Sequence, residues 1–355
     1  MAKKIFVMNF GSTSTKVAVY EDENEIVKES IQHSQDELKQ FKSIMDQKDF
    51  RQAAILDFLA KNHIDLKDFD CVITRGGCCR PIEGGIYEIS EEMLQDIASE
   101  QYGVHPSNLG STVAIEFGRK YHIPAITADT PSTDEFCSLA RYSGIKEIER
   151  VSLFHALNQK AIARRYAKKR NVPYESLNLI VVHMGGGISI AAHLKGKMID
   201  ANNALNGDGP FAPERAGTLP VGQLVKMCFS GNFTQNEMMK KISGGGGLMS
   251  YLGTNSGLEV EERIKDGDEY AKEIYKAMAY QVSKEVGAAA AVLKGKVDAI
   301  IFTASLAFSE LFTGWVKERV DFIAPVEILA GENEMLSLAE NALRYLSGEE
   351  MSKGY

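Results

Sequence analysis

The apolar positions near the N-terminus occur in short runs separated by polar turns. Residues 5–8 form an apolar run that ends at a turn of glycine, serine and threonine, and residues 16–20 resume with the alternation of a half-buried strand. A polar break follows and leads to Ile26 and Val27. We therefore expect three consecutive strands that form a meander.

Helical spacing then alternates with short strands. Apolar side chains recur on one helical face over residues 50–59, and residues 107–121 are also helical, with Ser107 as the expected N-cap. Residues 72–73 and 125–127 are short apolar runs typical of strands. The pattern therefore moves from a strand meander to alternating helices and strands.

The second half of the chain repeats this order. It contains a helix, a strand, a glycine turn and two further strands, at residues 154–169, 179–183, 184–187, 188–193 and 197–201. Residues 5–11 align with residues 179–185, almost half the chain away, which indicates an internal duplication. Strand hairpins are common and give the same short match, but here the third strand and the following helices recur as well. A long helix over residues 268–293, a strand at 299–303 and a closing helix near 333–346 complete an α/β protein of two related lobes.

Length and charge narrow the class of protein. At about 150 residues per domain, 355 residues correspond to two domains. The 40 Lys and Arg residues are outnumbered by 48 Asp and Glu residues, which gives a net charge of −8, so the chain lacks the cationic field that attracts nucleic acids and anionic membranes. Its 44% hydrophobic and 25% charged residues are typical of a globular protein. We expect no nucleic-acid or membrane partner.

The cysteines and apolar runs bear on the cellular compartment. The five cysteines match neither a disulfide framework nor a zinc site, because their number is odd, their spacing is irregular and Cys78 is adjacent to Cys79. The longest apolar run, residues 287–293, is far shorter than the ~20 residues that span a bilayer. The apolar stretch near the N-terminus is too short for a signal peptide. We therefore expect a soluble, cytoplasmic protein with reduced thiols.

The segment from Asn9 to Lys16 joins the first two expected strands and reads Asn-Phe-Gly-Ser-Thr-Ser-Thr-Lys. Glycine lets backbone N–H groups approach an anion, the hydroxyls add donors, and the lysine adds positive charge, so the segment suits phosphate. It differs from a Walker P-loop because it leads into a strand and not into a helix. An ordinary hairpin with a solvated lysine has the same residue types, and the segment alone leaves that alternative open.

The glycine turn at residues 184–187 is the equivalent turn in the second half and follows a strand that ends at His183. Three successive glycines permit positive φ angles and the close approach of a bulky anion. A flexible hairpin tip is the alternative interpretation. Two such turns at one cleft would hold a polyphosphate from both sides.

Two arginines and two histidines occupy loops or helix starts. Arg75 precedes two glycines, and Arg215 lies in a loop rich in proline and glycine, so both suit bidentate binding of carboxylate or phosphoryl oxygens. His155 is placed to donate to a developing negative charge, and His105 precedes a proline at the start of another helix. Surface arginines and structural or helix-capping histidines are the commoner roles of such residues.

Two carboxylates follow or precede expected elements. Asp129 at a strand end and Glu334 at the start of the last helix are candidate Mg²⁺ ligands, because this ion takes one or two carboxylates together with water and substrate phosphates. Carboxylates at such places are also routine caps. With the two turns and the arginines they indicate phosphoryl transfer, which depends on charge balance and alignment. No general base stands out, as expected for a carboxylate acceptor that is already ionised at pH 7.

These residues resemble the signature of the acetate and butyrate kinase family, within the sugar kinase, Hsp70 and actin superfamily. The similarity extends over essentially the whole chain and is carried by residues 9–16, 74–77, 104–110, 152–160, 182–187 and 207–217. The last three segments and the chain length are more similar to butyrate kinases than to acetate kinases, which are longer and carry a second histidine where this chain has Gln159. The resemblance implies two duplicated lobes of the actin-like ATPase (ribonuclease H-like) type with a cleft between them.

The resemblance also implies domain limits and a reaction. Residues 1–150 with the C-terminal helix at 333–355 would form the lobe with the first phosphate turn, and residues 151–332 the lobe with the second turn and the adenosine site. The implied reaction is ATP + butyrate = ADP + butanoyl phosphate, by direct in-line transfer with Mg²⁺. The expected partners are a short-chain carboxylate or its acyl phosphate and further copies of the chain, in a homodimer or larger homo-oligomer. The alternatives are a kinase for branched-chain acids (isobutyrate or isovalerate), propionate or acetate, and a non-catalytic nucleotide-binding relative.

The family pattern assigns a role to each matching residue. The residues expected to act on the transferring phosphoryl group are Asn9, Lys16, Asp129, His155 and Arg215. The residues expected around the nucleotide are Ser12, Ser14, His183, Gly185, Gly186, Gly187, Ala304 and Ser305. Asn9, Asp129 and Glu334 are expected at Mg²⁺. Arg75 and His105 are expected at the acceptor carboxylate, although the acetate kinase arginine aligns a few positions before Arg75, which can replace it only if its loop lets it reach.

Two positions depart from the family pattern. Phe10 stands where relatives have proline or a small residue, which would alter the first turn or narrow the cleft. Ala304 and Ser305 occupy the adenosine-binding turn, where relatives have two glycines. Because their Cβ atoms disfavour positive φ angles, we expect weaker nucleotide affinity, and glycine at both positions should tighten ATP binding.

Overall fold

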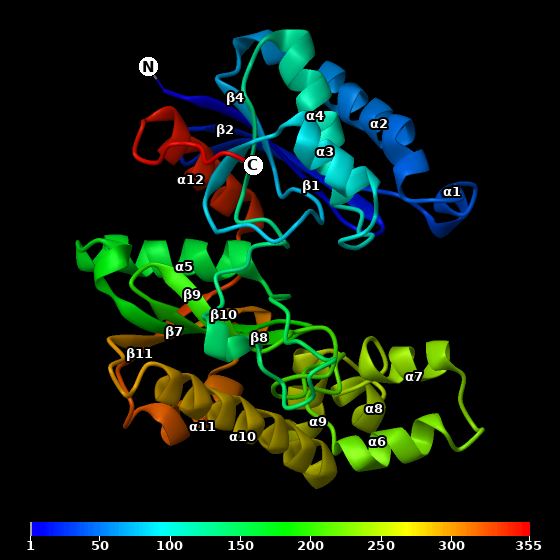
Figure 1. Cartoon of the computed structure of the whole chain (residues 1–355), viewed down its shortest axis with the longest axis vertical. Coiled ribbons are helices and arrows are strands. Elements are labelled where there is room, and N and C mark those ends of the chain that lie inside the picture. The colour runs from blue at the N-terminus through cyan, green and yellow to red at the C-terminus, as the bar shows by residue number, and fades with distance from the viewer. Residues whose placement is uncertain (1) are drawn as a thin grey trace. The chain divides into compact units, whose positions relative to one another are not determined.

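The computed structural model describes residues 2–355, which divide into two compact units (Figure 1). The first unit comprises the residues up to Asp134 together with Asn333–Tyr355, and the second comprises Glu135–Glu332, so residues 135–150 group with the second unit. Each unit has its own sheet with helices packed on it, which confirms the α/β class and the two related lobes expected from the sequence. Within residues 2–355, no helix is both long and apolar enough to cross a membrane.

The described part of the first unit is built on a six-stranded sheet with the strand order β3-β2-β1-β4-β6-β5. Its strands are β1 (Lys4–Phe10), β2 (Ser14–Glu21), β3 (Asn24–Gln32), β4 (Cys71–Thr74), β5 (Ile86–Glu88) and β6 (Ala125–Ala128). The first three strands form the predicted antiparallel meander, and β4 and β6 continue the sheet parallel to β1. β3 is longer than expected because exposed polar residues alternate with partly buried ones along this edge strand.

Helices cover both faces of the first sheet. The α-helices of this unit are α1 (Gln35–Leu38), α2 (Lys48–Lys61), α3 (Glu91–Ala98), α4 (Asn108–Tyr121) and α12 (Glu334–Leu346), of which the short α1 buries none of its residues. Phe6 and Met8 of β1 share one buried cluster with apolar residues of α2, α3 and α4, whereas α12, red in Figure 1, packs against β1, β4 and β6 on the other face. The C-terminal helix thus completes the first unit.

The second unit repeats the strand order of the first. Its sheet runs β11-β10-β7-β8-β9 and consists of β7 (Asn178–Met184), β8 (Ile188–Leu194), β9 (Lys197–Ala201), β10 (Ala299–Ala304) and β11 (Val326–Ala330). As in the first unit, an antiparallel meander is extended by two strands parallel to its innermost strand. The repeated topology confirms the internal duplication predicted from the alignment of residues 5–11 with 179–185.

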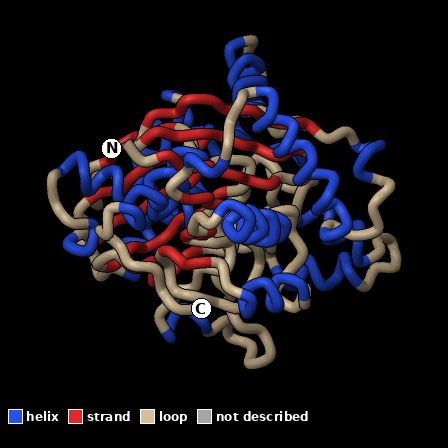
Figure 2. Tube along the Cα trace, turned by 90° about the horizontal axis from the view of Figure 1, so that it is seen from above, coloured by secondary structure: helices blue, strands red, loops and turns tan. Residues whose placement is uncertain are grey.

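Alternation along β7 explains how helices cover both faces of this sheet. Leu179 and Val181 pack with α5 (Ala156–Arg170), and Ile180 and Val182 pack with the long α10 (Glu269–Val292). Figure 2 shows the strands of the whole chain in red and the helices in blue. The remaining α-helices of this unit are α6 (Val221–Cys228), α7 (Gln235–Ile242), α8 (Leu248–Leu252), α9 (Gly257–Lys265) and α11 (Glu310–Val320). Short 3₁₀ helices lie at Met45–Gln47, Leu66–Asp68, Ser138–Arg141, Tyr174–Ser176 and Ser305–Phe308.

Two local expectations are corrected by the structure. Ser107 does precede α4, but its backbone is already helical and its hydroxyl makes no cap; the Oγ atom lies 2.9 Å from Nδ1 of His105 instead. Phe10 is 1% exposed and packs in the core of the first unit, close to Gly110 of α4. Its side chain therefore fills the core under the first turn.

Candidate functional site

The first turn is a tight hairpin between β1 and β2. The N–H of Gly11 donates to the carbonyl of Ser14 at 2.8 Å, and Asn9 and Lys16 are cross-strand partners. Asn9 is 4% exposed, and its Nδ2 donates to Oε2 of Glu334 at 2.7 Å. Because Glu334 is the first residue of α12, this contact joins the start of the chain to its last helix.

Four sequence-predicted residues converge at this corner of the first unit. Nη1 of Arg75 lies 3.5 Å from Oε1 of Glu334, which also accepts from Asn9 through its other oxygen. Burial lowers the pKa of His105, and the Arg75 guanidinium lowers it further, whereas Glu334 opposes the shift. The N–H of Ser107 donates to Nδ1 of His105 at 3.1 Å, so the neutral ring carries its proton on Nε2. The corner thus presents an arginine and an imidazole N–H donor to an anion.

Asp129 lies at the end of β6, as predicted. It is 2% exposed, it has a φ of 43°, and its Oδ1 accepts the N–H of Gly85 at 2.9 Å. Among residues 2–355, no three His, Cys, Asp or Glu side chains group as a ready-made metal site. One or two carboxylates with an amide oxygen nearby still fit Mg²⁺, since phosphate oxygens and water supply its other ligands.

The second set of residues lies around the turn between β7 and β8. His155 occupies the N-cap position of α5, and its ring stacks on that of His183, with centroids 3.7 Å apart and an interplanar angle of 11°. Nδ1 of His183 lies 2.7 Å from Oδ1 of Asn158, and its Nε2 lies 3.5 Å from Oε1 of Glu332. Two stacked imidazolium ions would repel each other, so the stack favours at least one neutral ring.

Two of the three glycines of this turn, Gly185 and Gly187, are required by close packing and not by φ. Gly185, Gly186 and Gly187 all lack the positive φ angles expected from the sequence. A Cβ atom on Gly185 would lie 3.1 Å from Nε2 of His183, and one on Gly187 would lie 3.1 Å from the carbonyl oxygen of Ala204. The turn therefore needs glycine because neighbouring groups leave little room beside it.

A buried hydrogen-bonded chain leads away from His155. Nδ1 of His155 lies 3.0 Å from Oγ of Ser189, which accepts from Nε2 of Gln159 at 3.2 Å. Oε1 of Gln159 lies 3.0 Å from Nε2 of His193, whose Nδ1 lies 2.7 Å from the hydroxyl of Tyr174. We call these four residues, Ser189, Gln159, His193 and Tyr174, the relay.

The relay assigns the proton of His155. Burial lowers the pKa of His193 to about 3, so its ring is neutral. An amide oxygen only accepts, so His193 donates from Nε2 to Gln159. The amide nitrogen of Gln159 in turn donates to Ser189, which leaves the Ser189 hydroxyl proton for Nδ1 of His155. His155 thus carries its own proton on Nε2.

Arg215 lies beside His155 in the second unit. A Cβ atom on Gly187 would lie 3.7 Å from Cε1 of His155 and 3.9 Å from Cγ of Arg215, so the two side chains flank the glycine turn. Nη1 of Arg215 lies 3.3 Å from Oε2 of Glu214. The Nε atom of Arg215 is buried and has no hydrogen-bond partner within residues 2–355, which leaves a donor for an anion.

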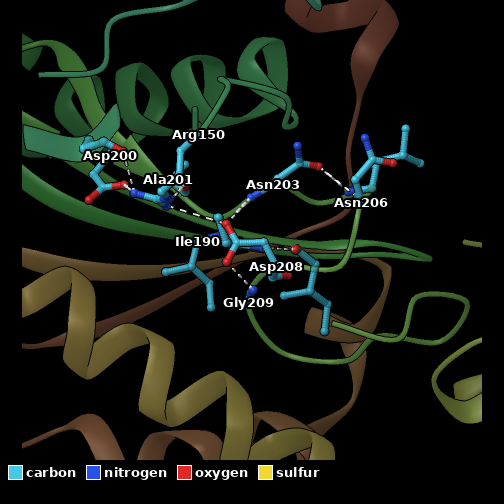
Figure 3. A network of polar contacts seen from close by, with 12 residues as sticks. Arg150, Ile190, Asp200, Ala201, Asn203, Asn206, Asp208 and Gly209 are labelled. Atoms are coloured by element: carbon cyan, nitrogen blue, oxygen red, sulfur yellow. Dashed lines mark hydrogen bonds and ion pairs between the residues drawn. The ribbon is translucent and has the colours of Figure 1, made fainter. Parts of the chain in front are cut away.

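The loop that carries Arg215 is fixed from both ends. At its start, Arg150 donates to Asp200 at 2.9 Å and lies 3.6 Å from Asp208, which accepts the N–H of Gly209 at 2.9 Å (Figure 3). At its end, a Cβ atom on Gly247 would lie 1.6 Å from the carbonyl oxygen of Ala212 in the same loop. Gly246 and Gly247, in the run of glycines at residues 244–247, thus pack closely against this loop.

The expected adenosine turn has the strain predicted from its sequence. Ala304 has φ 69° and ψ −165°, a region that glycine adopts almost exclusively, and its N–H and C=O both pair with Gly331. Ser305 has no positive φ and is exposed. The departure from the family pattern therefore matters at Ala304.

Sequence reasoning missed several residues of these sites. Asn158 and Gln159 lie three and four positions after His155 on α5, so helical spacing places them on its face. Glu332 lies two positions before Glu334. Nothing in the sequence marked Ser189 as a functional residue, because a serine in a strand is common.

Three comparisons bear on this arrangement. Residues 141–312 match the model of the acetokinase family. Over all 355 residues and the whole of both chains, the sequence is 49% identical to butyrate kinase 2 of Clostridium acetobutylicum. The fold resembles the crystal structure of Porphyromonas gingivalis acetate kinase, with a TM-score of 0.80 and 19% identity over 97% of this chain and 100% of that one. It also resembles a propionate kinase of Francisella tularensis, with a TM-score of 0.73 and 18% identity over 96% and 98% of the two chains.

Proposed function

The chain belongs to the acetokinase family, and from this premise we propose that it is a butyrate kinase that transfers the γ-phosphoryl group between ATP and butyrate. The observation that carries the reaction is that His155 and Arg215 both lie next to Gly187. The choice of butyrate is supported by the full-length similarity to a butyrate kinase. Transfer is direct, from the γ-phosphorus of ATP to a carboxylate oxygen, and yields ADP and butanoyl phosphate.

In the second unit, two donors face the glycine turn. The charge on a transferring phosphoryl group spreads over its three equatorial oxygens, and fixed donors stabilise it most. Arg215 supplies a guanidinium whose Nε is still unpaired, and His155 supplies a neutral N–H donor at Nε2. Gly185, Gly186, Gly187 and His183 are proposed at the nucleotide phosphates, and Ala304 and Ser305 at the adenosine.

In the first unit, the corner around Glu334 is proposed to hold the metal and the acceptor. Asn9, Asp129 and Glu334 supply oxygen ligands, direct or through water, for Mg²⁺, which would neutralise phosphate charge when bound. Arg75 and His105 are proposed to bind the acceptor carboxylate. Ser12, Ser14 and Lys16 are proposed to contact the γ-phosphoryl group.

The test is acyl phosphate formation, trapped as the hydroxamate, with Mg-ATP and linear and branched acids of two to six carbons. We expect the highest kcat/KM with butyrate, and a loss of about 100-fold or more in Arg215→Ala and His155→Ala, as for removal of a transition-state donor. Arg170→Ala is the matched control, because Arg170 is exposed at the far end of α5. If kcat/KM is highest with isobutyrate, propionate or acetate, that acid replaces butyrate as the proposed substrate. Mg-ATP binding without turnover of any acid would refute catalysis and support a nucleotide-binding protein.

We also propose that the chain forms a homo-oligomer. Helix α6 is apolar on one side but buries none of its residues, and Val221, Val225 and Phe229 are 68%, 49% and 87% exposed. An apolar row of this kind fits a second copy of the chain. Light scattering after size-exclusion chromatography should give a dimer or larger assembly for the wild type and a smaller species for Val225→Asp. A wild-type monomer would refute the proposal.

A cytoplasmic location is proposed from the chemistry of the chain. All five cysteines are free thiols, including Cys78 and Cys79, which are adjacent. Free thiols persist in reducing compartments, where ATP is also available. Fractionation of cells that express the protein would test this.

A further inference from the structure

Arg51 lies on α2 behind the first turn and is completely buried. Its Nη1 donates to the carbonyls of Gly11 at 2.7 Å and Ser14 at 3.0 Å, and its Nη2 donates to the carbonyl of Ser12 at 3.0 Å. Nε and Nη2 also donate to Oε1 of Gln47 at 3.0 and 2.9 Å. One guanidinium therefore holds three carbonyls of a turn that is only a few residues long.

Among the described residues, 2–355, the charge of Arg51 has no anionic partner. All of its hydrogen-bond acceptors are uncharged, and within residues 2–355 no carboxylate perturbs its pKa, which burial alone lowers to about 10. The group is still a cation at neutral pH. The neighbouring His33, which lies 2.8 Å from Oγ1 of Thr15, is kept neutral because burial and Arg51 both lower its pKa.

An unpaired buried cation is costly unless an anion approaches it. Nearby carbonyl dipoles offset part of the cost of removing a guanidinium from water, and a full negative charge offsets more. The carbonyls of Gly11, Ser12 and Ser14 point to Arg51, so their negative ends do not face a ligand on the other side of the turn. The orientation of the carbonyls and the positive charge of Arg51 therefore both favour an anion at the first turn.

We propose that Arg51 is a positioning residue for phosphoryl transfer, which fixes the first turn for the polyphosphate of Mg-ATP and supplies buried counter-charge for it. This inference rests on the proposed function and deepens it, because it assigns phosphate recognition to a residue that lies outside the turn. This role also explains why Arg51 lies on the buried face of α2 together with Ile55 and Phe58.

Substitution of Gln47 separates the charge of Arg51 from its structural role. In Gln47→Glu the new carboxylate occupies the place of the amide oxygen that now accepts from Nε and Nη2. Arg51 keeps its shape and its bonds to the turn, but its charge is neutralised by a close ion pair. If Arg51 only supports the fold, this variant is as stable as the wild type and binds nucleotide equally well. If its charge serves the phosphates, the variant folds and binds nucleotide less well.

The experiment measures the Kd of Mg-ATP by calorimetry, kcat and KM for ATP and butyrate, and the thermal midpoint of each free protein. We expect Gln47→Glu to keep or raise its thermal midpoint and to raise the Kd of Mg-ATP about tenfold, with the KM for butyrate within about threefold. Arg51→Lys keeps a cation but loses the fork that bridges three carbonyls, so we expect a similar rise in Kd. Lys48→Met is the control, because Lys48 lies on the same helix and pairs with Glu116 at 2.7 Å.

The outcomes distinguish this inference from the function it rests on. If the wild type forms butanoyl phosphate while Gln47→Glu and Arg51→Lys fold and bind Mg-ATP as it does, the role of Arg51 is overturned and the kinase remains. If the wild type binds no Mg-ATP, the proposed function fails and the role of Arg51 fails with it. Where Arg51→Lys does not fold, the result for Gln47→Glu decides.

Discussion

Replacement of Ser189 with alanine removes the one hydroxyl that joins the relay to His155. Ser189 is fully buried, and its hydroxyl contacts both Nδ1 of His155 and Nε2 of Gln159. Gln159 keeps a second acceptor, the Ser189 carbonyl at 3.1 Å, so the amide is not left unpaired. The substitution therefore acts mainly on His155, which is then free to carry its proton on either nitrogen.

The size of the effect can be bounded. One neutral hydrogen bond contributes about 1 kcal/mol, so stability should fall by about 1–2 kcal/mol. Complete removal of a transition-state donor costs about 100- to 1000-fold in kcat. Since His155 is retained but no longer fixed, we expect kcat for Ser189→Ala to fall about tenfold, with small changes in KM for ATP and butyrate.

Initial rates of hydroxamate formation give kcat and KM, and ¹⁵N spectra of labelled histidine report which ring nitrogen carries the proton. Ser283→Ala is a matched control, because Ser283 is also buried and donates to a carbonyl of α10, at 2.8 Å from Ala279. An unchanged kcat with His155 still protonated on Nε2 would refute the reasoning. A lower kcat in the control as well would assign the loss to general destabilisation.

Three further outcomes are expected. Lys160→Met should lower the free energy of unfolding in urea by about 3–5 kcal/mol, because the charge of Glu135 then stays buried without this lysine. The double variant Lys160→Met with Glu135→Gln should recover part of the loss. A Lys160→Met variant as stable as the wild type would contradict this. The folded pKa of His193, about 3, lies below its ordinary 6.5, so protonation favours the unfolded chain. The free energy of unfolding should therefore fall between pH 6.5 and 3 by up to about 1.4 kcal/mol per pH unit. Calorimetry at several pH values should show a smaller slope for His193→Gln. Glycine at Ala304 and Ser305 should lower the Kd of ATP in calorimetry, because it relieves a strained φ; an unchanged or higher Kd would count against that idea.

Local pattern was enough to predict the elements that bury one regular face. The apolar runs that became β1 and β7, and the helical face of α2, were all predictable because burial in a sheet or on a core leaves a clear period. Helices α6 to α9 were not predicted, because α6 buries none of its residues and α7, α8 and α9 bury one residue each, so no core-facing stripe marks their bounds.

The candidate site was predictable only where residue type and turn chemistry coincide. Asn9, Arg75 and Glu334 stood out by their positions at element ends, and the structure brings them together. Ser189 lies in an ordinary strand, and its role depends on which side chain happens to face it across the fold. Arg51 did leave a signal, a charge on an apolar helical face, but the meaning of that charge depends on the carbonyls that it meets.

The packing of α12 has a consequence for biosynthesis. The bond between Asn9 and Glu334 joins residues separated by 325 positions, and Lys353 and Tyr355 likewise donate to Gly84 and Asp96. A ribosome adds about 5–20 residues per second and releases the N-terminal part first, so the first β-meander waits for nearly the whole chain to be synthesised. During that time its corner lacks Glu334. A chain cut short before its last helix would retain the turns at residues 9–16 and 184–187 but could not form the Asn9–Glu334 bond. This corner of the first unit is therefore completed only at the end of synthesis.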